Sequence, residues 1–149
     1  QVDGTTVGKP TVINFFVNRA LSGESLTVYE PGTQARNFIH VKDVARVYLR
    51  SAERLLEQVA ADVTGIETYE IASREDMSVM TVAEIVQEVS EAELETTVSV
   101  ELVENPRRGE TMVEEFGVDI STANTALGWE PVESVRDSVR QLVRMGVSE

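Results

Sequence analysis

The residue best placed to do chemistry is Arg36, a single cation that follows the turn residues Pro31 and Gly32. A guanidinium there could face a cleft and bind an anion through two parallel hydrogen bonds, as arginine does with carboxylates and phosphates. The alternative is an arginine on the exposed surface of a hairpin. The local pattern leaves both possibilities open.

Other residue types that often do chemistry point to structural roles. His40 is the only histidine and the chain has no cysteine, so the sequence predicts a packed or hydrogen-bonded imidazole and no metal site. Several glutamates resemble acid/base pairs, but in so acidic a chain we expect them on a solvated face. These are Glu91, Glu93, Glu95, Glu114 and Glu115.

The composition limits the classes of partner. The 149 residues fit one domain, and 42% hydrophobic content is enough for a core. A net charge of −13 would repel nucleic-acid phosphates. No segment reads as a membrane span or a secretory signal, so we expect a cytoplasmic protein without a membrane partner. Only Lys9 and Lys42 are lysines, and an acid-rich, lysine-poor surface is typical of halophilic proteins, the alternative being an ordinary acidic bacterial protein.

The elements that must position these residues alternate between helices and short strands. Residues 1–9 are expected to form a loop. Two apolar runs flank Pro31 and Gly32 and predict a β-hairpin that carries Arg36. Periodicity predicts helices after Pro10 and Asp43, at 81–89 after a Thr81–Glu84 capping box, at 121–127 and at 134–145. Strands are expected at 68–72 and 97–103, with a further short strand at 113–120.

Three side chains have predicted roles at the ends of these elements. Asp43 is expected to cap the start of the second helix, where a carboxylate satisfies free amides. Gly128 is expected to end the helix at 121–127. Trp129 follows in LGWEP and is predicted to fill a hydrophobic core. The fold is therefore predicted to be α/β, with four or five helices and four to six short strands.

Two blocks of the sequence together match a known pattern. The segment from Gly23 to Asp43 fits G-x-x-L-x-V-Y-x-x-G-x-Q-x-R-x-F-I-x-V-x-D, and NPRRGETMVEEFGVDISTANTALGWEP is similar to R-P-G-D … D-x-S-K-A-x-x-x-L-G-W-x-P. The chain from Pro10 onward thereby resembles extended short-chain dehydrogenase/reductases that act on nucleotide sugars, the NAD-dependent epimerases and dehydratases.

The resemblance implies a substrate site. Arg36 corresponds to an arginine that contacts the nucleotide diphosphate, and Arg107 to a second one, so two guanidiniums would bind the phosphate oxygens. Arg108 stands where proline is usual, which leaves open which of the neighbouring arginines reaches the ligand. Glu110 replaces an aspartate that holds a sugar or ribose hydroxyl. Tyr29 either packs in the core or contacts the nucleotide base.

The family's redox machinery is absent from this sequence. The residues four positions after Tyr29, Tyr48 and Tyr69 are not lysines, so there is no Tyr-x-x-x-Lys pair, and no Gly-rich dinucleotide turn occurs. The resemblance then implies that residues 1–149 are one C-terminal substrate-binding region that lacks the Rossmann core. NAD would bind the intact parent and not this chain, which alone would be inactive.

The same resemblance implies the partners and the activity. Residues 41–72 are expected to pack on the missing Rossmann domain, and the chain on its own is expected to self-associate or to swap elements. A homodimer is the expected assembly. The parent is predicted to be UDP-glucose 4-epimerase-like. Alternatives are a dTDP-glucose 4,6-dehydratase, a UDP-glucuronate decarboxylase, or a non-catalytic acidic binding module.

Overall fold

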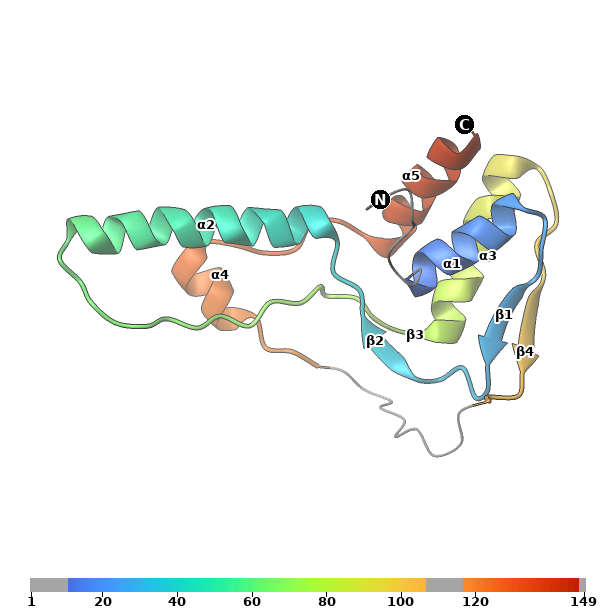
Figure 1. The fold of residues 1–149 in the computed structure, drawn as a ribbon, viewed down its shortest axis with the longest axis horizontal. Helices are drawn as coiled ribbons and strands as arrows, with labels where there is room; N and C mark the ends of the chain where they lie inside the picture. The colour runs from blue at the N-terminus through green and yellow to red at the C-terminus, as the bar shows by residue number, and fades with distance from the viewer. Residues whose placement is uncertain (1–10, 107–116, 148–149) are drawn as a thin grey trace, which may run out of the picture. The chain divides into compact units, whose positions relative to one another are not determined.

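A computed structural model describes residues 11–106 and 117–147 (Figure 1). Within these ranges the chain forms five helices and four short strands, which confirms the α/β class. The chain divides into two compact units, and each is described by itself. Of the described residues, the first unit comprises 11–33, 78–106 and 139–147, and the second comprises 34–77 and 117–138.

The first unit is a two-stranded parallel sheet covered by helices. Strand β1 pairs with β4 from Leu26 opposite Val100 to Tyr29 opposite Val103, and helices α1 and α3 pack against each other and on these strands (Figure 1). Its elements are α1 (Val12–Leu21), β1 (Leu26–Tyr29), α3 (Val79–Leu94), β4 (Val100–Val103) and the part of α5 (Val135–Val147) from Val139 onward. Its buried apolar side chains include Phe16, Leu26, Val28, Val82, Val86, Val139 and Val143.

The second unit is built around one long helix. Its elements are β2 (Ala35–Asn37), α2 (Val41–Ala60), the first residues of β3 (Asp76–Ser78), α4 (Ser121–Leu127) and the start of α5. Strand β2 pairs with β3, and α4 packs on α2. A cluster of buried side chains fills the space between α2 and α4, and consists of Val47, Ala123, Leu127 and Trp129. Trp129 therefore fills a core, as its sequence context predicts.

The predicted hairpin is wrong. Strand β1 pairs with β4 and strand β2 with β3, so the turn at Pro31 and Gly32 joins strands of different sheets. The carbonyl oxygen of Gly32 accepts a hydrogen bond of 3.0 Å from the amide of Met80, which directs the turn to the first residues of α3. Burial of Leu26 and Val28 under α1 and α3 decides the pairing, because the apolar partner strand lies far away in sequence.

The predicted strand at 68–72 is also wrong. Its alternation is real, since Tyr69 and Ile71 pack on the Trp129 cluster and Glu70 is exposed. The segment has no strand beside it in the described part of the chain, so no ladder forms. Strand β4 covers only the second half of the predicted 97–103. Of the predicted strand at 113–120, residues 117–120 are not a strand, and the remainder lies outside the described residues.

Helix α3 begins earlier and ends later than the predicted 81–89. Its N-cap is Ser78, whose Oγ accepts a hydrogen bond of 3.0 Å from the amide of Thr81. The predicted Thr81–Glu84 capping box is therefore wrong, because Thr81 lies inside the helix. Two other local signals are confirmed. Gly128 ends α4 in the left-handed conformation, and the Oγ of Ser134 accepts 3.1 Å from the amide of Asp137 at the start of α5.

Replacing the cap residue Ser78 with alanine is expected to lower the free energy of unfolding by about 1 kcal/mol, because the amide of Thr81 loses its acceptor. Urea denaturation followed by far-UV circular dichroism measures the change. The matched control is Thr81→Ala, which leaves that amide bonded and should cost less. A larger loss for Thr81→Ala than for Ser78→Ala would contradict the observed cap.

Candidate functional site

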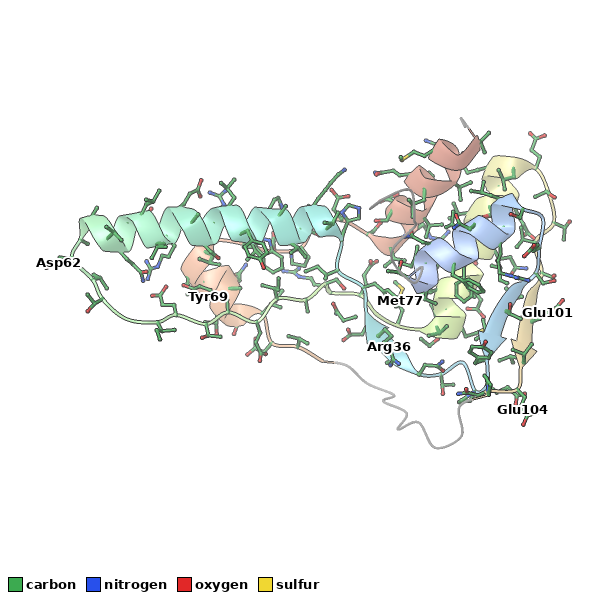
Figure 2. All side chains as sticks on the ribbon, in the orientation of Figure 1. Arg36, Asp62, Tyr69, Met77, Glu101 and Glu104 are labelled. Carbon is green, nitrogen blue, oxygen red and sulfur yellow. The ribbon has the colours of Figure 1, made fainter. Side chains whose placement is uncertain are left out.

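Arg36 lies in the middle of the three-residue strand β2, with an exposed side chain (Figure 2). Its Nη1 donates a hydrogen bond of 2.8 Å to the carbonyl oxygen of Ala35. Among the described residues no carboxylate forms an ion pair with Arg36. Ion pairs do hold Arg19, Arg46, Arg50, Arg54, Arg74, Arg140 and Arg144. Arg36 therefore presents an exposed guanidinium that pairs with no carboxylate of the described residues.

Asn37 fixes the strand that carries Arg36. Its Nδ2 donates 3.0 Å to the carbonyl oxygen of Ser73 and 2.7 Å to Oδ1 of Asp76, and its Oδ1 accepts 2.8 Å from the amide of Ser73. These bonds tie β2 to residues 73–76 through a side chain next to Arg36. The sequence analysis assigned no role to Asn37, whose only signal was an amide side chain directly after Arg36.

A buried carboxylate orders the start of α2. Asp43 is fully buried, and its Oδ2 accepts 3.2 Å from the amide of Val132 and 3.1 Å from that of Glu133. Arg46 Nη2 donates 2.8 Å to its Oδ1. The predicted capping role is therefore wrong, because the N-cap of α2 is His40, whose Nδ1 accepts 3.1 Å from the amide of Lys42. Asp43 instead joins α2 to the loop after Trp129.

Gln34 lies two residues before Arg36, and its Oε1 is buried with no hydrogen-bond donor among the described residues. A buried acceptor without a donor costs about 1–3 kcal/mol. Near Arg36 there is thus a second polar group whose hydrogen-bonding capacity the described structure does not use.

The structure does not test whether the remaining predicted site residues act together with Arg36. Tyr29 ends β1 in the first unit and is 51% exposed, so its ring is not part of the core. Arg36 belongs to the second unit. Arg107, Arg108 and Glu110 lie outside the described residues.

Two of the glutamates expected on a solvated face have structural partners. Glu93 forms two hydrogen bonds of 2.9 Å with Arg144, and these bonds lower the pKa of its carboxyl. Oε1 of Glu91 accepts 3.0 Å from the amide of Val98. These carboxylates therefore stabilise the ends of α3 and α5, which is a structural use.

A second charged cluster ties the loop after α2 back to the helix. Arg54 donates 3.0 Å from Nη2 to Oε1 of Glu67, and Tyr69 donates from its hydroxyl to the same carboxylate. The hydrogen bond from Arg54 is the first cause that lowers the pKa of Glu67, and the bond to Glu67 raises the pKa of Tyr69. Figure 2 places Tyr69 on this loop. The cluster anchors the loop and offers no nucleophile.

The described residues contain no group of three or more acidic or histidine side chains that would hold a metal ion. In the same part of the chain, no helix combines the length and apolar character needed to cross a bilayer. The binding of an anion by Arg36 stays a prediction from the sequence.

Comparison with known proteins agrees with the sequence pattern. The model of the NAD dependent epimerase/dehydratase family matches residues 4–72, which include Tyr29 and Arg36. UDP-glucuronic acid decarboxylase 6 of Arabidopsis thaliana is 31% identical over 128 residues, or 86% of this chain and 33% of that protein. The chain belongs to the NAD dependent epimerase/dehydratase family.

Solved structures of epimerases share the fold of this family member. A UDP-glucose 4-epimerase of Thermotoga maritima, solved with UDP-glucose, has a TM-score of 0.70 and 23% identity, covering 95% of this chain and 41% of its own. A UDP-N-acetylglucosamine 4-epimerase of Methanobrevibacter ruminantium, in complex with UDP-N-acetylmuramic acid, has a TM-score of 0.69 and 25% identity, covering 99% and 42%. The chain spans about a third of the length of the curated relatives it matches.

Proposed function

We propose that this chain is the nucleotide-sugar-binding part of an NAD-dependent epimerase of the UDP-glucose 4-epimerase type. The observation that carries the proposal is Arg36, an exposed guanidinium with no carboxylate partner among the described residues, on a strand held by Asn37. It lies within the segment that matches the family. The similar fold of an epimerase solved with UDP-glucose supports the substrate class.

In this proposal Arg36 binds the pyrophosphate of the sugar nucleotide through two parallel hydrogen bonds. Arg107 or Arg108 supplies a second guanidinium, Glu110 accepts a hydrogen bond from a sugar or ribose hydroxyl, and Tyr29 contacts the base. NAD, which takes up a hydride from the sugar, is held by a Rossmann domain that is not part of this sequence. The chain alone is then inactive, since it has no Tyr-x-x-x-Lys pair.

The proposal also assigns a role to residues 41–72. In the intact parent this segment packs on the dinucleotide-binding domain, and the apolar side chains that α2 leaves exposed support that assignment. One alternative activity of the parent has a specific observation in its favour. A UDP-glucuronate decarboxylase is favoured by the 31% identity to the Arabidopsis protein. Incubating the parent with UDP-glucose and with UDP-glucuronate, and analysing the products, separates the two activities.

Replacing Arg36 with alanine in the parent enzyme is expected to weaken UDP-glucose binding roughly 30-fold. The charge-assisted hydrogen bonds that it loses contribute about 2 kcal/mol, and each 1.4 kcal/mol is about tenfold in affinity. Isothermal titration with UDP-glucose, dTDP-glucose and UDP measures the change, and Arg107→Ala tests the second guanidinium.

The matched control for that titration is Arg50→Ala, which removes an exposed arginine that already pairs with Glu53 at 2.9 Å. Its affinity should equal that of the wild type. Unchanged affinity in both the Arg36 and Arg107 variants would exclude the diphosphate contact. An upstream coding sequence without a Gly-rich turn and a Tyr-x-x-x-Lys pair would instead favour a non-catalytic binding module.

A further inference from the structure

The backbone of strand β2 sets the direction of Arg36. Among the described residues, its guanidinium bonds only to the carbonyl oxygen of Ala35, the residue before it. In that part of the chain, no ion pair and no hydrogen bond beyond its own strand fixes the side chain. Strands β2 and β3 have three residues each, and a two-stranded sheet is marginally stable by itself. The direction of Arg36 therefore depends on what else holds β2.

The side chain of Asn37 supplies the hold that the short ladder lacks. Its amide donates 3.0 Å to the carbonyl oxygen of Ser73 and accepts 2.8 Å from the backbone amide of the same residue. Residue pairs of an antiparallel ladder exchange hydrogen bonds in both directions in the same way, so this side chain in effect adds one rung. Nδ2 of Asn37 also donates 2.7 Å to Oδ1 of Asp76, and hydrogen bonds to a carboxylate are the stronger kind.

These bonds act on Arg36 through the alternation of side chains along a strand. Successive side chains of a strand point to opposite faces. Ala35 is buried, Arg36 is exposed and Asn37 is half-buried, which agrees with this alternation. Because Asn37 is held on one face, β2 cannot turn about its own axis, and the side chain of Arg36 stays on the solvent face.

The anchoring segment 73–76 is itself held in place. Oε2 of Glu75 accepts a hydrogen bond of 2.7 Å from the amide of Val135, the first residue of α5. Nη2 of Arg74 donates 2.7 Å to Oε2 of Glu130. A binding group needs such support, because a site that is about 1 Å too loose loses much of its effect.

We propose that Asn37 is the positioning residue of the anion site. Its amide holds β2 so that the guanidinium of Arg36 presents two hydrogen bonds to the diphosphate of a sugar nucleotide, and Asn37 itself does not touch the ligand. The proposal rests on the proposed function, since it takes Arg36 to bind the diphosphate. Removing the amide should then weaken binding although the arginine is intact.

A double-mutant cycle in the intact parent tests the proposal. In isothermal titration, Asn37→Ala is expected to weaken UDP-glucose binding roughly tenfold, the lower end of what outer hydrogen-bond partners contribute at metal sites. In the Arg36→Ala background the same substitution should change nothing, because the group that it positions is absent. An equal loss in that background would mean that Asn37 acts by another route and would overturn the proposal.

The result for Arg36→Ala separates this proposal from the proposed function. If Arg36→Ala weakens binding and Asn37→Ala does not, the diphosphate contact stands and the positioning role fails. If Arg36→Ala binds UDP-glucose as tightly as the wild type, both fail. The matched control is Asn124→Ala, which removes another asparagine side chain of the second unit, one that donates 3.4 Å to the carbonyl oxygen of Trp129. Its affinity should equal that of the wild type.

Steady-state kinetics distinguish positioning from a loss of folded protein. A diphosphate contact holds substrate and transition state equally, so Asn37→Ala should raise KM and leave kcat unchanged. A variant that is only partly folded has fewer active molecules, which lowers kcat at an unchanged KM. That second pattern would overturn the proposal.

Exchanging the two partners of the 2.7 Å contact is a further test. Asn37→Asp should weaken binding, because it removes the donor and places a second carboxylate against Asp76. The double variant Asn37→Asp/Asp76→Asn returns one donor and one acceptor to this contact and should recover part of the lost affinity. A double variant that binds UDP-glucose no better than Asn37→Asp would contradict the positioning role.

Discussion

Replacing Asp43 with alanine is expected to lower the free energy of unfolding of the second unit by about 3 kcal/mol. The variant removes a fully buried carboxylate that accepts hydrogen bonds from the amides of Val132 and Glu133 and from Arg46. Hydrogen bonds to a charged group each contribute about 1.5–3 kcal/mol, and a buried amide that loses its acceptor keeps its desolvation cost. The side chain of Arg46 is partly exposed, so water replaces the acceptor that Arg46 loses in the variant.

The only tryptophan of the chain provides the readout for this variant. Trp129 lies in the core of the second unit, so its fluorescence in urea follows the unfolding of that unit. Asp43→Asn keeps one acceptor oxygen and should lose about half as much stability. Glu53→Ala removes an exposed carboxylate of the same helix and should stay within about 0.5 kcal/mol. If Asp43→Ala were as stable as that control, its hydrogen bonds would contribute nothing.

Signals that act within one turn of the chain predicted the structure well. Gly128 ends α4 because it adopts a positive φ that other residues rarely adopt. Ser134 begins α5 because its hydroxyl reaches an amide three residues ahead. These features depend on neighbouring residues alone, so the sequence contains all the information that specifies them.

Features that depend on distant residues were not predicted. The turn at Pro31 and Gly32 has the composition of a hairpin, but β1 has its partner more than seventy residues ahead in β4. Asp43 lies in the first turn of an amphipathic helix, where a carboxylate resembles an ordinary cap, and only the position of Val132 and Glu133 shows what it binds. Burial and long-range pairing determine the partner of β1 and the hydrogen bonds of Asp43, and a local sequence pattern contains no information about either.

The role of Arg36 in the candidate site stays a prediction. The sequence indicated a cation that binds an anion, and the structure shows that this guanidinium has no carboxylate partner among the described residues. Asn37, which positions it, was missed because its partners Ser73 and Asp76 lie far along the chain. The resemblance supplied the roles of Arg107, Arg108 and Glu110, which stay predictions.

The second large effect concerns Trp129, and the expected loss for Trp129→Ala is about 3–5 kcal/mol. The indole is 2% exposed and packs against Val47 and Leu127, so alanine leaves a cavity in the smaller of the two cores. The indole nitrogen also donates 3.0 Å to the carbonyl oxygen of Asp43. The residue therefore joins α2 to α4 through both packing and a hydrogen bond.

Trp129→Phe separates these two contributions, because phenylalanine keeps most of the apolar volume and lacks the donor. Its loss should be about 1–2 kcal/mol, the sum of one hydrogen bond and a small cavity. Far-UV circular dichroism in urea measures both variants, since neither contains tryptophan. An alanine variant no less stable than the phenylalanine variant would mean that the core collapses around the missing ring.

The double variant Asp43→Ala/Trp129→Phe then tests whether the two residues act as one unit. Both residues hold the segment from Trp129 to Glu133 against the start of α2. Once one substitution has loosened that segment, the second should lower the free energy of unfolding by less. Residues in one hydrogen-bond network show interaction energies of about 0.5–3 kcal/mol. The double variant should therefore lose less stability than the two single losses added. Strict additivity would show that the carboxylate and the indole stabilise the unit independently.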